Sequence, residues 1–219
     1  MIEKNETVGE TWHENRYLGC GVDTPNHFYS YSFEPSHEWT EFYSKRDEQH
    51  WYFEISADKY DLRRDICFEM EVNLLIYDEA SASCGVSTGG KDGAEKTLKA
   101  NAVITAVGQL NRRKLPDIPG LHTFEGPAFH IVGWADDPKA YLGISVPKFP
   151  NLFVLYGPNT DLGHGLSAIF HGECQMRYTM KCLNGLIEGD QRTMEVRKDV
   201  NDIFIERCEA AYVGACGPK

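Results

Sequence analysis

The chain has 219 residues, of which 42% are hydrophobic and 12% aromatic, a composition that supports a folded domain with its own core and excludes a disordered chain. Its formal net charge of -11 argues against a nucleic-acid or anionic-membrane partner, because the sequence has no long run of Lys and Arg to offset that charge. We therefore expect a small-molecule partner.

The cysteines and the first residues of the chain indicate the cell compartment in which we expect the protein. The seven cysteines are an odd number and form no C-x-x-C pair, so we expect free thiols rather than a disulfide framework or a zinc ribbon. No apolar run approaches the roughly 20 residues that span a bilayer, and the start at residues 1–4 does not resemble a signal peptide. These features predict a cytoplasmic protein.

The first half of the chain opens with an irregular region. Residues 1–8 are mostly polar, so we expect any strand there to lack most of its N-terminal part. Residues 15–45 are rich in Tyr, Phe, Pro, Ser and Asn without a helical or strand period, which predicts a long ordered loop held by aromatic packing. Residues 47–60 follow as a helix, with Trp51 and Ile55 at helical spacing.

Strand patterns come next. Residues 66–72 alternate as a strand, and an apolar run over 74–77 continues from it. Residues 84–88 should pair with 96–100 as a β-hairpin, because the glycine-rich segment 89–93 lies between them.

Two continuous apolar runs, 102–107 and 152–156, are typical of strands buried on both faces in a parallel or mixed sheet. Each run ends at a glycine, Gly108 or Gly157, and the stretch between the runs is punctuated by prolines.

Two helices are expected near the C-terminus. The first should cover residues 166–187 and stop at Gly189, and the second should cover about 200–212. We expect one buried stripe on the first helix, formed by Ile169, Phe170, Met176 and Leu183.

Three blocks of sequence are specific enough to indicate a family. Residues 8–34 read VGETWHENRYLGCGVDTPNHFYSYSFE, and residues 149–178 read FPNLFVLYGPNTDLGHGLSAIFHGECQMRY. Between them, residues 124–134 have the pattern F-x-G-x-x-x-H-x-x-x-W, preceded by AVGQLNRRKLPDIPG. In this order the blocks resemble those of the Baeyer–Villiger flavoprotein monooxygenases.

The resemblance implies an α/β fold, namely the remnant of a FAD-binding Rossmann-like fold that has two dinucleotide-binding domains in the complete family. It implies a mixed sheet, a β-hairpin layer and C-terminal helices. The family's N-terminal G-x-G-x-x-G, which holds the FAD pyrophosphate, has no counterpart in this sequence. Trp134 is followed by a segment resembling the one that lies beyond the family's inserted NADPH-binding domain, so that insertion is expected to be missing.

We therefore expect residues 1–219 to form a single, incomplete FAD-binding-type domain. Residues 1–134 would be its N-terminal part and residues 135–219 its C-terminal part.

The first cofactor positions implied by the resemblance lie near the N-terminus. Glu3 stands where the family places the acid that binds the adenosine ribose of FAD; it could equally be an exposed glutamate near a frayed end. Gly9, Thr11 and Trp12 correspond to the turn that approaches the flavin, although Trp12 could also be a core aromatic. Glu10 replaces the second glycine of that turn, and its charge would crowd a phosphate-rich cofactor.

The catalytic candidates are Asp23 and His130. The aspartate matching Asp23 lies beside the flavin in the family, whereas a plain structural interpretation pairs it with Arg16 to pin the loop. His130 matches a residue that couples the flavin and NADPH domains, and its alternative is a hydrogen-bonded structural histidine.

A second group of cofactor positions follows the apolar run at 152–156. Gly157, Pro158, Asn159 and Thr160 precede the N-terminus of the next helix, whose positive dipole end can stabilise an anionic flavin ring. The alternative is an ordinary strand-to-helix turn. We expect no metal site, because His164 and His171 are seven residues apart and have no third ligand at a suitable spacing.

Three functions remain open from the sequence. By resemblance, the chain is a FAD- and NADPH-dependent monooxygenase that inserts oxygen next to a ketone, in secondary metabolism, but is not self-sufficient. Alternatively, it binds a bulky apolar metabolite without flavin and uses Asp23 and His130 in an acid–base rearrangement or cyclisation. A third possibility is an inactive fragment, or one completed by a homodimer partner or a complementing chain.

Overall fold

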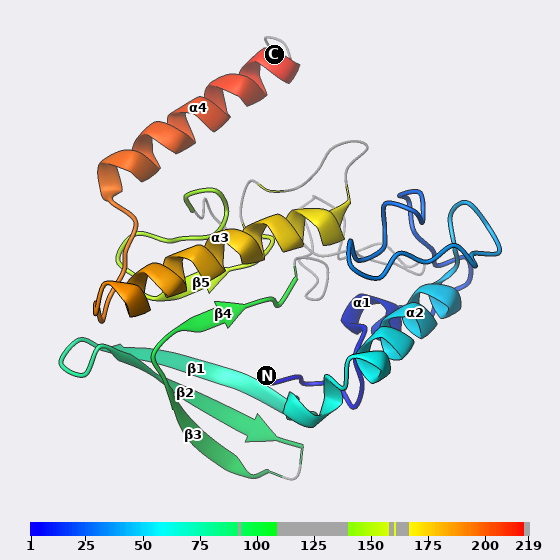
Figure 1. Ribbon diagram of the computed structural model, residues 1–219, viewed down its shortest axis with the longest axis horizontal. Coiled ribbons are helices and arrows are strands. Elements are labelled where there is room, and N and C mark those ends of the chain that lie inside the picture. Colours follow the sequence, from blue (N-terminus) through cyan, green and yellow to red (C-terminus); the bar gives the residue numbers. More distant parts are fainter. Residues whose placement is uncertain (92, 109–139, 158–159, 161–166, 217–219) are drawn as a thin grey trace, which may run out of the picture.

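The computed structural model describes residues 1–91, 93–108, 140–157, 160 and 167–216. The fold is mixed α/β, with one antiparallel sheet, one parallel pair of strands and helices (Figure 1). Within the described ranges the elements in chain order are α1 (Glu10–Glu14), α2 (Arg46–Lys59), the 3-10 helix η1 (Arg63–Asp65), β1 (Met70–Asp78), β2 (Ser83–Gly90), β3 (Glu95–Ala100), β4 (Val103–Thr105), β5 (Leu152–Val154), α3 (Ala168–Glu188) and α4 (Lys198–Cys216).

The predicted β-hairpin is confirmed, and it belongs to a three-stranded antiparallel sheet in the order β1-β2-β3. Cys84 lies opposite Ala100 and Thr88 opposite Lys96, which is the register that the sequence predicts. The two apolar runs expected before the hairpin merge into the single strand β1, because an irregularity between Val72 and Leu74 absorbs one residue.

The expected start of β1 at residue 66 is wrong. Glu69 has a φ of 55°, in the left-handed region that a strand cannot contain, so the strand begins only at Met70. The segment before it makes one parallel bridge instead, between Ile2 and Cys67.

The two buried strands predicted at 102–107 and 152–156 are present as β4 and β5, and they pair in parallel. Both are shorter than expected. Leu155 donates the last backbone hydrogen bond of the pair to Thr105, and Tyr156 then turns into the left-handed region with a φ of 54°. The expectation that both strands are buried on both faces is wrong for β4. Ile104 of β4 is exposed, whereas Phe153 of β5 is buried.

Asn151 ties this parallel pair to the segment that follows α3. The side chain is buried, and its amide nitrogen donates to the carbonyls of Asn101 and Arg192, both at 2.9 Å. Its amide oxygen accepts from the backbone N–H of Met194 at 2.9 Å. One buried amide therefore satisfies three backbone groups from two segments that are far apart in the sequence.

Helix α3 is confirmed, and it begins one residue after Ser167, whose hydroxyl caps it by accepting from the N–H of Phe170. The helix ends at Gly189, as expected. The expected buried stripe is wrong at Phe170, which is exposed. The fully buried positions are instead Gln175, Thr179 and Leu186, because the two polar members bond to backbone groups inside the fold.

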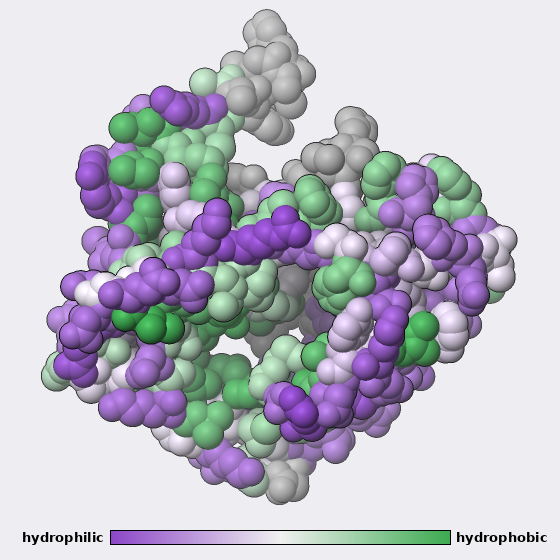
Figure 2. All heavy atoms as spheres, viewed as in Figure 1, coloured by the Kyte–Doolittle hydropathy of each residue, from purple (hydrophilic) through white to green (hydrophobic). Residues whose placement is uncertain are grey.

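Helix α4 is also confirmed and extends away from the rest of the chain (Figure 1). Its ring contact is between Phe204 and Tyr141, whose centroids are 5.3 Å apart. Figure 2 shows hydrophobic residues on the surface of α4 and of the three-stranded sheet. Ile203 of α4 and Leu74 and Ile76 of β1 are exposed.

The aromatic region before α2 contains no helix or strand over residues 15–45, as predicted. Its rings pack on α2, which starts and ends within one residue of the expected bounds. Tyr52 of α2 is almost completely buried: its phenol oxygen accepts from the N–H of Tyr31 and its O–H donates to the carbonyl of Glu34, both at 2.7 Å. This side chain therefore fixes the loop to the helix.

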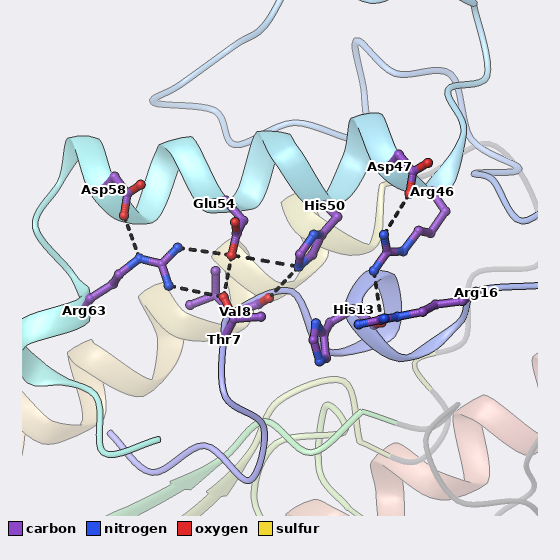
Figure 3. Close-up of polar contacts among 10 residues, drawn as sticks. All are labelled: Thr7, Val8, His13, Arg16, Arg46, Asp47, His50, Glu54, Asp58 and Arg63. Carbon is purple, nitrogen blue, oxygen red and sulfur yellow. Dashed lines mark hydrogen bonds and ion pairs between the residues drawn. The ribbon is translucent and has the colours of Figure 1, made fainter. Parts of the chain in front are cut away.

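The short helix α1 is held against α2 by a set of polar contacts that we call the α1–α2 clamp, shown in Figure 3. In its first half, Glu54 accepts from the hydroxyl of Thr7 and from Arg63 at 3.1 Å, and His50 donates to the carbonyl of Val8 at 3.2 Å. These contacts fix the two residues that lead into α1.

The second half of the clamp lies at the end of α1. The carbonyl of His13 accepts from Arg46 Nη2 and from Arg16 Nε, both at 3.0 Å. The rings of His13 and His50 lie 5.5 Å apart between the two halves. Both ends of α1 are thus bonded to side chains from outside that helix.

No helix in the described parts of the chain is long and apolar enough to cross a membrane. The prediction of free thiols is confirmed for the six cysteines that the structure describes, namely Cys20, Cys67, Cys84, Cys174, Cys182 and Cys208.

We expect Tyr52→Phe to lower the free energy of unfolding by about 1–3 kcal/mol, because the N–H of Tyr31 and the carbonyl of Glu34 would lose their buried partner. The exposed Tyr43 provides a matched control, for which Tyr43→Phe should change stability by less than about 0.5 kcal/mol. Urea denaturation measures both. Equal effects of the two substitutions would contradict the anchoring role of Tyr52.

The clamp also predicts a pH dependence. The hydroxyl of Thr7 and then the guanidinium of Arg63 hold the pKa of Glu54 below its usual value. A carboxylate with a lowered pKa stabilises the folded state above its unfolded pKa of about 4.3, and that contribution is lost as the pH falls through the folded value.

Glu54→Gln should therefore flatten the fall of unfolding free energy between about pH 5 and pH 3. Glu38→Gln, at an exposed carboxylate in the loop, should leave the slope as in the wild type. A Glu54→Gln slope indistinguishable from the wild type would show that this contact does not stabilise the fold.

Candidate functional site

The first cofactor position, Glu3, lies at the end of the parallel bridge between Ile2 and Cys67. Its backbone N–H donates to the carbonyl of Cys67 at 2.9 Å. Its carboxylate accepts from the N–H of Asn5 at 2.8 Å, so part of its hydrogen-bonding capacity is already used within the chain. The remaining carboxylate oxygen could accept from a ribose hydroxyl.

The turn at Gly9 requires glycine. Its φ is 100°, a conformation that other residues adopt only with strain, and a Cβ there would lie 2.7 Å from Cδ2 of His50. The turn leads directly into α1, where Trp12 is buried beside Cys20 and Val22. Trp12 is therefore a core residue in this structure, and the indole helps to hold the turn in place.

Glu10 sits in an unfavourable conformation with its carboxylate beside Gly108. Its φ is 23°, which is uncommon for a residue with a side chain. A Cβ at Gly108 would lie 3.2 Å from Oε1 of Glu10, so the carboxylate lies against the backbone of the segment that follows β4. The hydroxyl of Thr11 donates to its other oxygen at 3.0 Å.

Tyr29 of the aromatic loop packs against the core residues that hold the α1 turn. Its ring stands edge-on to Trp12 at 5.8 Å between centroids. Burial raises the pKa of the Tyr29 phenol, and the nearby ionisable groups of Asp23, Tyr156 and Glu10 raise it further. Tyr29 is partly buried, and the aromatic loop that carries it also contacts α3, where the N–H of Ser32 donates to Glu173 at 2.8 Å.

Asp23 is exposed, and its carboxylate accepts a long hydrogen bond of 3.4 Å from the hydroxyl of Thr24. The Arg16–Asp23 pair that the structural interpretation suggested is not formed, because Arg16 bonds to the carbonyl of His13 instead. Arg16 still pins the loop, but through the backbone of α1. The carboxylate of Asp23 is left accessible.

In the second cofactor segment the structure describes Gly157 and Thr160, and these two residues and the preceding Tyr156 are held by their surroundings. The N–H of Tyr156 donates to Oε1 of the buried Gln175 at 2.6 Å, which fixes the strained residue to α3. A Cβ at Gly157 would lie 2.3 Å from the carbonyl oxygen of Gly143, so only glycine fits. Thr160 is buried, and its hydroxyl donates to the carbonyl of Gly157 at 2.6 Å.

Three of the predicted site residues, His130, Pro158 and Asn159, lie outside the described residues, as does His164. Among the described residues, no three or more His, Cys, Asp or Glu side chains are grouped so as to hold a metal ion.

Sequence reasoning missed Tyr29, Gly108 and Gln175. A tyrosine among many aromatic residues carries no distinguishing pattern, and a glutamine on the buried face of α3 contradicts the apolar stripe expected there. Gly108 was recognised only as the end of an apolar run.

The residues present fit the ring end of a flavin better than its phosphate end. Gly9 and Gly157 present backbone without side chains, which a planar ring needs for a close approach, and neither position has room for a Cβ. Glu10 adds a carboxylate at the same place, and a negative charge opposes a pyrophosphate. The sequence contains no G-x-G-x-x-G to hold that group.

Comparison with known proteins identifies relatives along much of this chain. No protein-family model matches it. A Baeyer–Villiger monooxygenase from Streptomyces coelicolor is 38% identical over 137 residues, which cover 63% of this chain and 25% of the relative. A Baeyer–Villiger monooxygenase from Pseudomonas aeruginosa is 34% identical over 137 residues, with the same coverage of 63% and 25%.

The fold comparison agrees. A crystal structure of OTEMO in complex with FAD and NADP (form 3) matches with a TM-score of 0.50 and 32% identity, covering 58% of this chain and 24% of that chain. The chain spans about a quarter of the length of the curated relatives that it matches. Sequence and fold together show that the chain is homologous to the Baeyer–Villiger-type flavin monooxygenases.

Proposed function

We propose that this chain supplies the flavin-contacting part of a Baeyer–Villiger-type monooxygenase, with FAD as cofactor, NADPH as reductant and a ketone as substrate. The names of the relatives and the FAD and NADP in the OTEMO complex support this proposal. The observation that carries it is that the segments meet in the fold: Glu10 of the α1 turn lies against Gly108 after β4, and Ser32 of the aromatic loop donates its N–H to Glu173 of α3 at 2.8 Å.

In this proposal each segment has a physical task. The glycine turn at Gly9 and the turn at Gly157 allow backbone to approach the edge of the flavin ring. Thr160 holds the second turn through its hydrogen bond to the carbonyl of Gly157. Asp23 presents an accessible carboxylate beside that space, and Glu3 would bind the ribose with the carboxylate oxygen that Asn5 leaves unused.

When bound, FAD supplies the redox chemistry of oxygen insertion, and the protein supplies binding, orientation and electrostatics. The strain at Tyr156 and Glu10 is consistent with such a site, because strained backbone gathers where a ligand must be placed accurately. No observation favours the flavin-independent rearrangement as a second function, since the relatives described above are monooxygenases.

We expect the purified chain to bind FAD, and Thr160→Val to weaken that binding about tenfold, because the loss of one buried hydrogen bond of about 1–1.5 kcal/mol would loosen the turn. Thr40→Val, at an exposed threonine that bonds to Glu48, is the matched control and should leave the affinity unchanged. Quenching of flavin fluorescence during a titration measures both. Absence of any FAD binding by the wild-type chain would refute the proposed function.

Glu10 offers a test of the electrostatics. Glu10→Gln removes the charge and keeps the shape, so FAD should bind about tenfold more tightly if the carboxylate repels the cofactor. Glu10→Gly should bind at least as tightly, since it also relieves the φ of 23°. The same fluorescence titration applies, and weaker binding by Glu10→Gln would show that the carboxylate helps to hold the flavin.

A further inference from the structure

The end of α1 gathers positive charge on a single neutral acceptor. Arg16 Nε and Arg46 Nη2 both donate to the carbonyl oxygen of His13, each at 3.0 Å. Figure 3 shows the two guanidinium groups meeting at this carbonyl, one from the loop after α1 and one from the first turn of α2. Two fixed positive charges are therefore held within a few ångströms of each other.

Little negative charge offsets them. Arg46 pairs with the adjacent Asp47 at 2.7 Å, but the side chain of Asp47 is 91% exposed and its attraction is screened by water. Arg16 forms no ion pair within the described parts of the chain. The other nearby carboxylate, Glu54, is already engaged by Thr7 and Arg63. In a chain with a net charge of -11, this is a local excess of positive charge.

The cluster also contains buried polar atoms without a partner. These are Arg46 Nε and His13 Nδ1, both of which are shielded from solvent and form no hydrogen bond. A buried donor that lacks an acceptor costs about 1–3 kcal/mol, and more when it is charged. The side chain of Arg46 is only 17% exposed, so water compensates it poorly.

We propose that Arg16 and Arg46 form a binding site for a phosphate group at the end of α1. The guanidinium fork matches the oxygens of phosphate bidentately, and two guanidiniums match its double charge. Arg16 is well suited to the first contact, because its two terminal amino groups donate to no group in the described structure and its side chain reaches solvent. This site does not depend on the proposed flavin function.

The phosphate could be inorganic or part of a nucleotide, and titration calorimetry at constant ionic strength separates these sources. We expect saturable binding of inorganic phosphate to the wild-type chain. If ADP binds more than about tenfold tighter than phosphate, the source is a nucleotide, and if it binds equally, the site recognises the phosphate alone. Absence of saturable binding of either probe would overturn the proposal.

Arg16→Gln is the informative variant, because Arg16 is exposed and the carbonyl of His13 keeps its bond from Arg46, so the end of α1 stays attached to α2. Loss of one charge-assisted, bidentate contact should weaken phosphate binding about tenfold. Arg64→Gln is the matched control, since Arg64 is an exposed arginine on η1 that already pairs with Asp61 and Asp65. Equal loss of binding in the two variants would show a diffuse charge effect and refute the site.

Discussion

The α1–α2 clamp is the constraint on which the site depends most. Helix α1 has only five residues, and such a short helix is not stable alone. The clamp bonds both ends of α1 to α2. Before the helix, the carbonyl of Val8 accepts from His50, and at its end the carbonyl of His13 accepts from Arg46. Because the glycine turn at Gly9 lies between these bonds, its left-handed conformation is set by contacts with side chains distant in sequence.

This constraint links the fold to the function. The clamp places Trp12 in the core, Trp12 packs against Tyr29, and the aromatic loop contacts α3 through the bond from Ser32 to Glu173. In the proposed function, segments more than a hundred residues apart in the sequence line one site. Glu10 stands at the turn, and its negative charge opposes the binding of a phosphate-rich cofactor there.

Much of the fold could be predicted from local patterns. The register of the β2–β3 hairpin follows from its glycine-rich turn, and α2, α3 and α4 follow from helical spacing and from Gly189. Failures arose where contacts distant in sequence decided the outcome. The left-handed residues Glu69 and Tyr156 shortened strands whose apolar pattern continues, and Gln175 is buried because it bonds to the backbone of Tyr156. The bond of Arg16 to the carbonyl of His13 is local, three residues apart, but no residue pattern distinguishes it from a pair with Asp23.

The central claim of the proposed function is that residues 8–30, 152–157 and 160 form a single flavin-facing surface. Hydrogen exchange measured by mass spectrometry on the chain, with and without saturating FAD, tests it most directly. The account predicts that peptides from both segments exchange more slowly together when FAD is present, while peptides from β1 to β3 remain unchanged. Protection confined to one of the two segments, or found only on the antiparallel sheet, would contradict the claim.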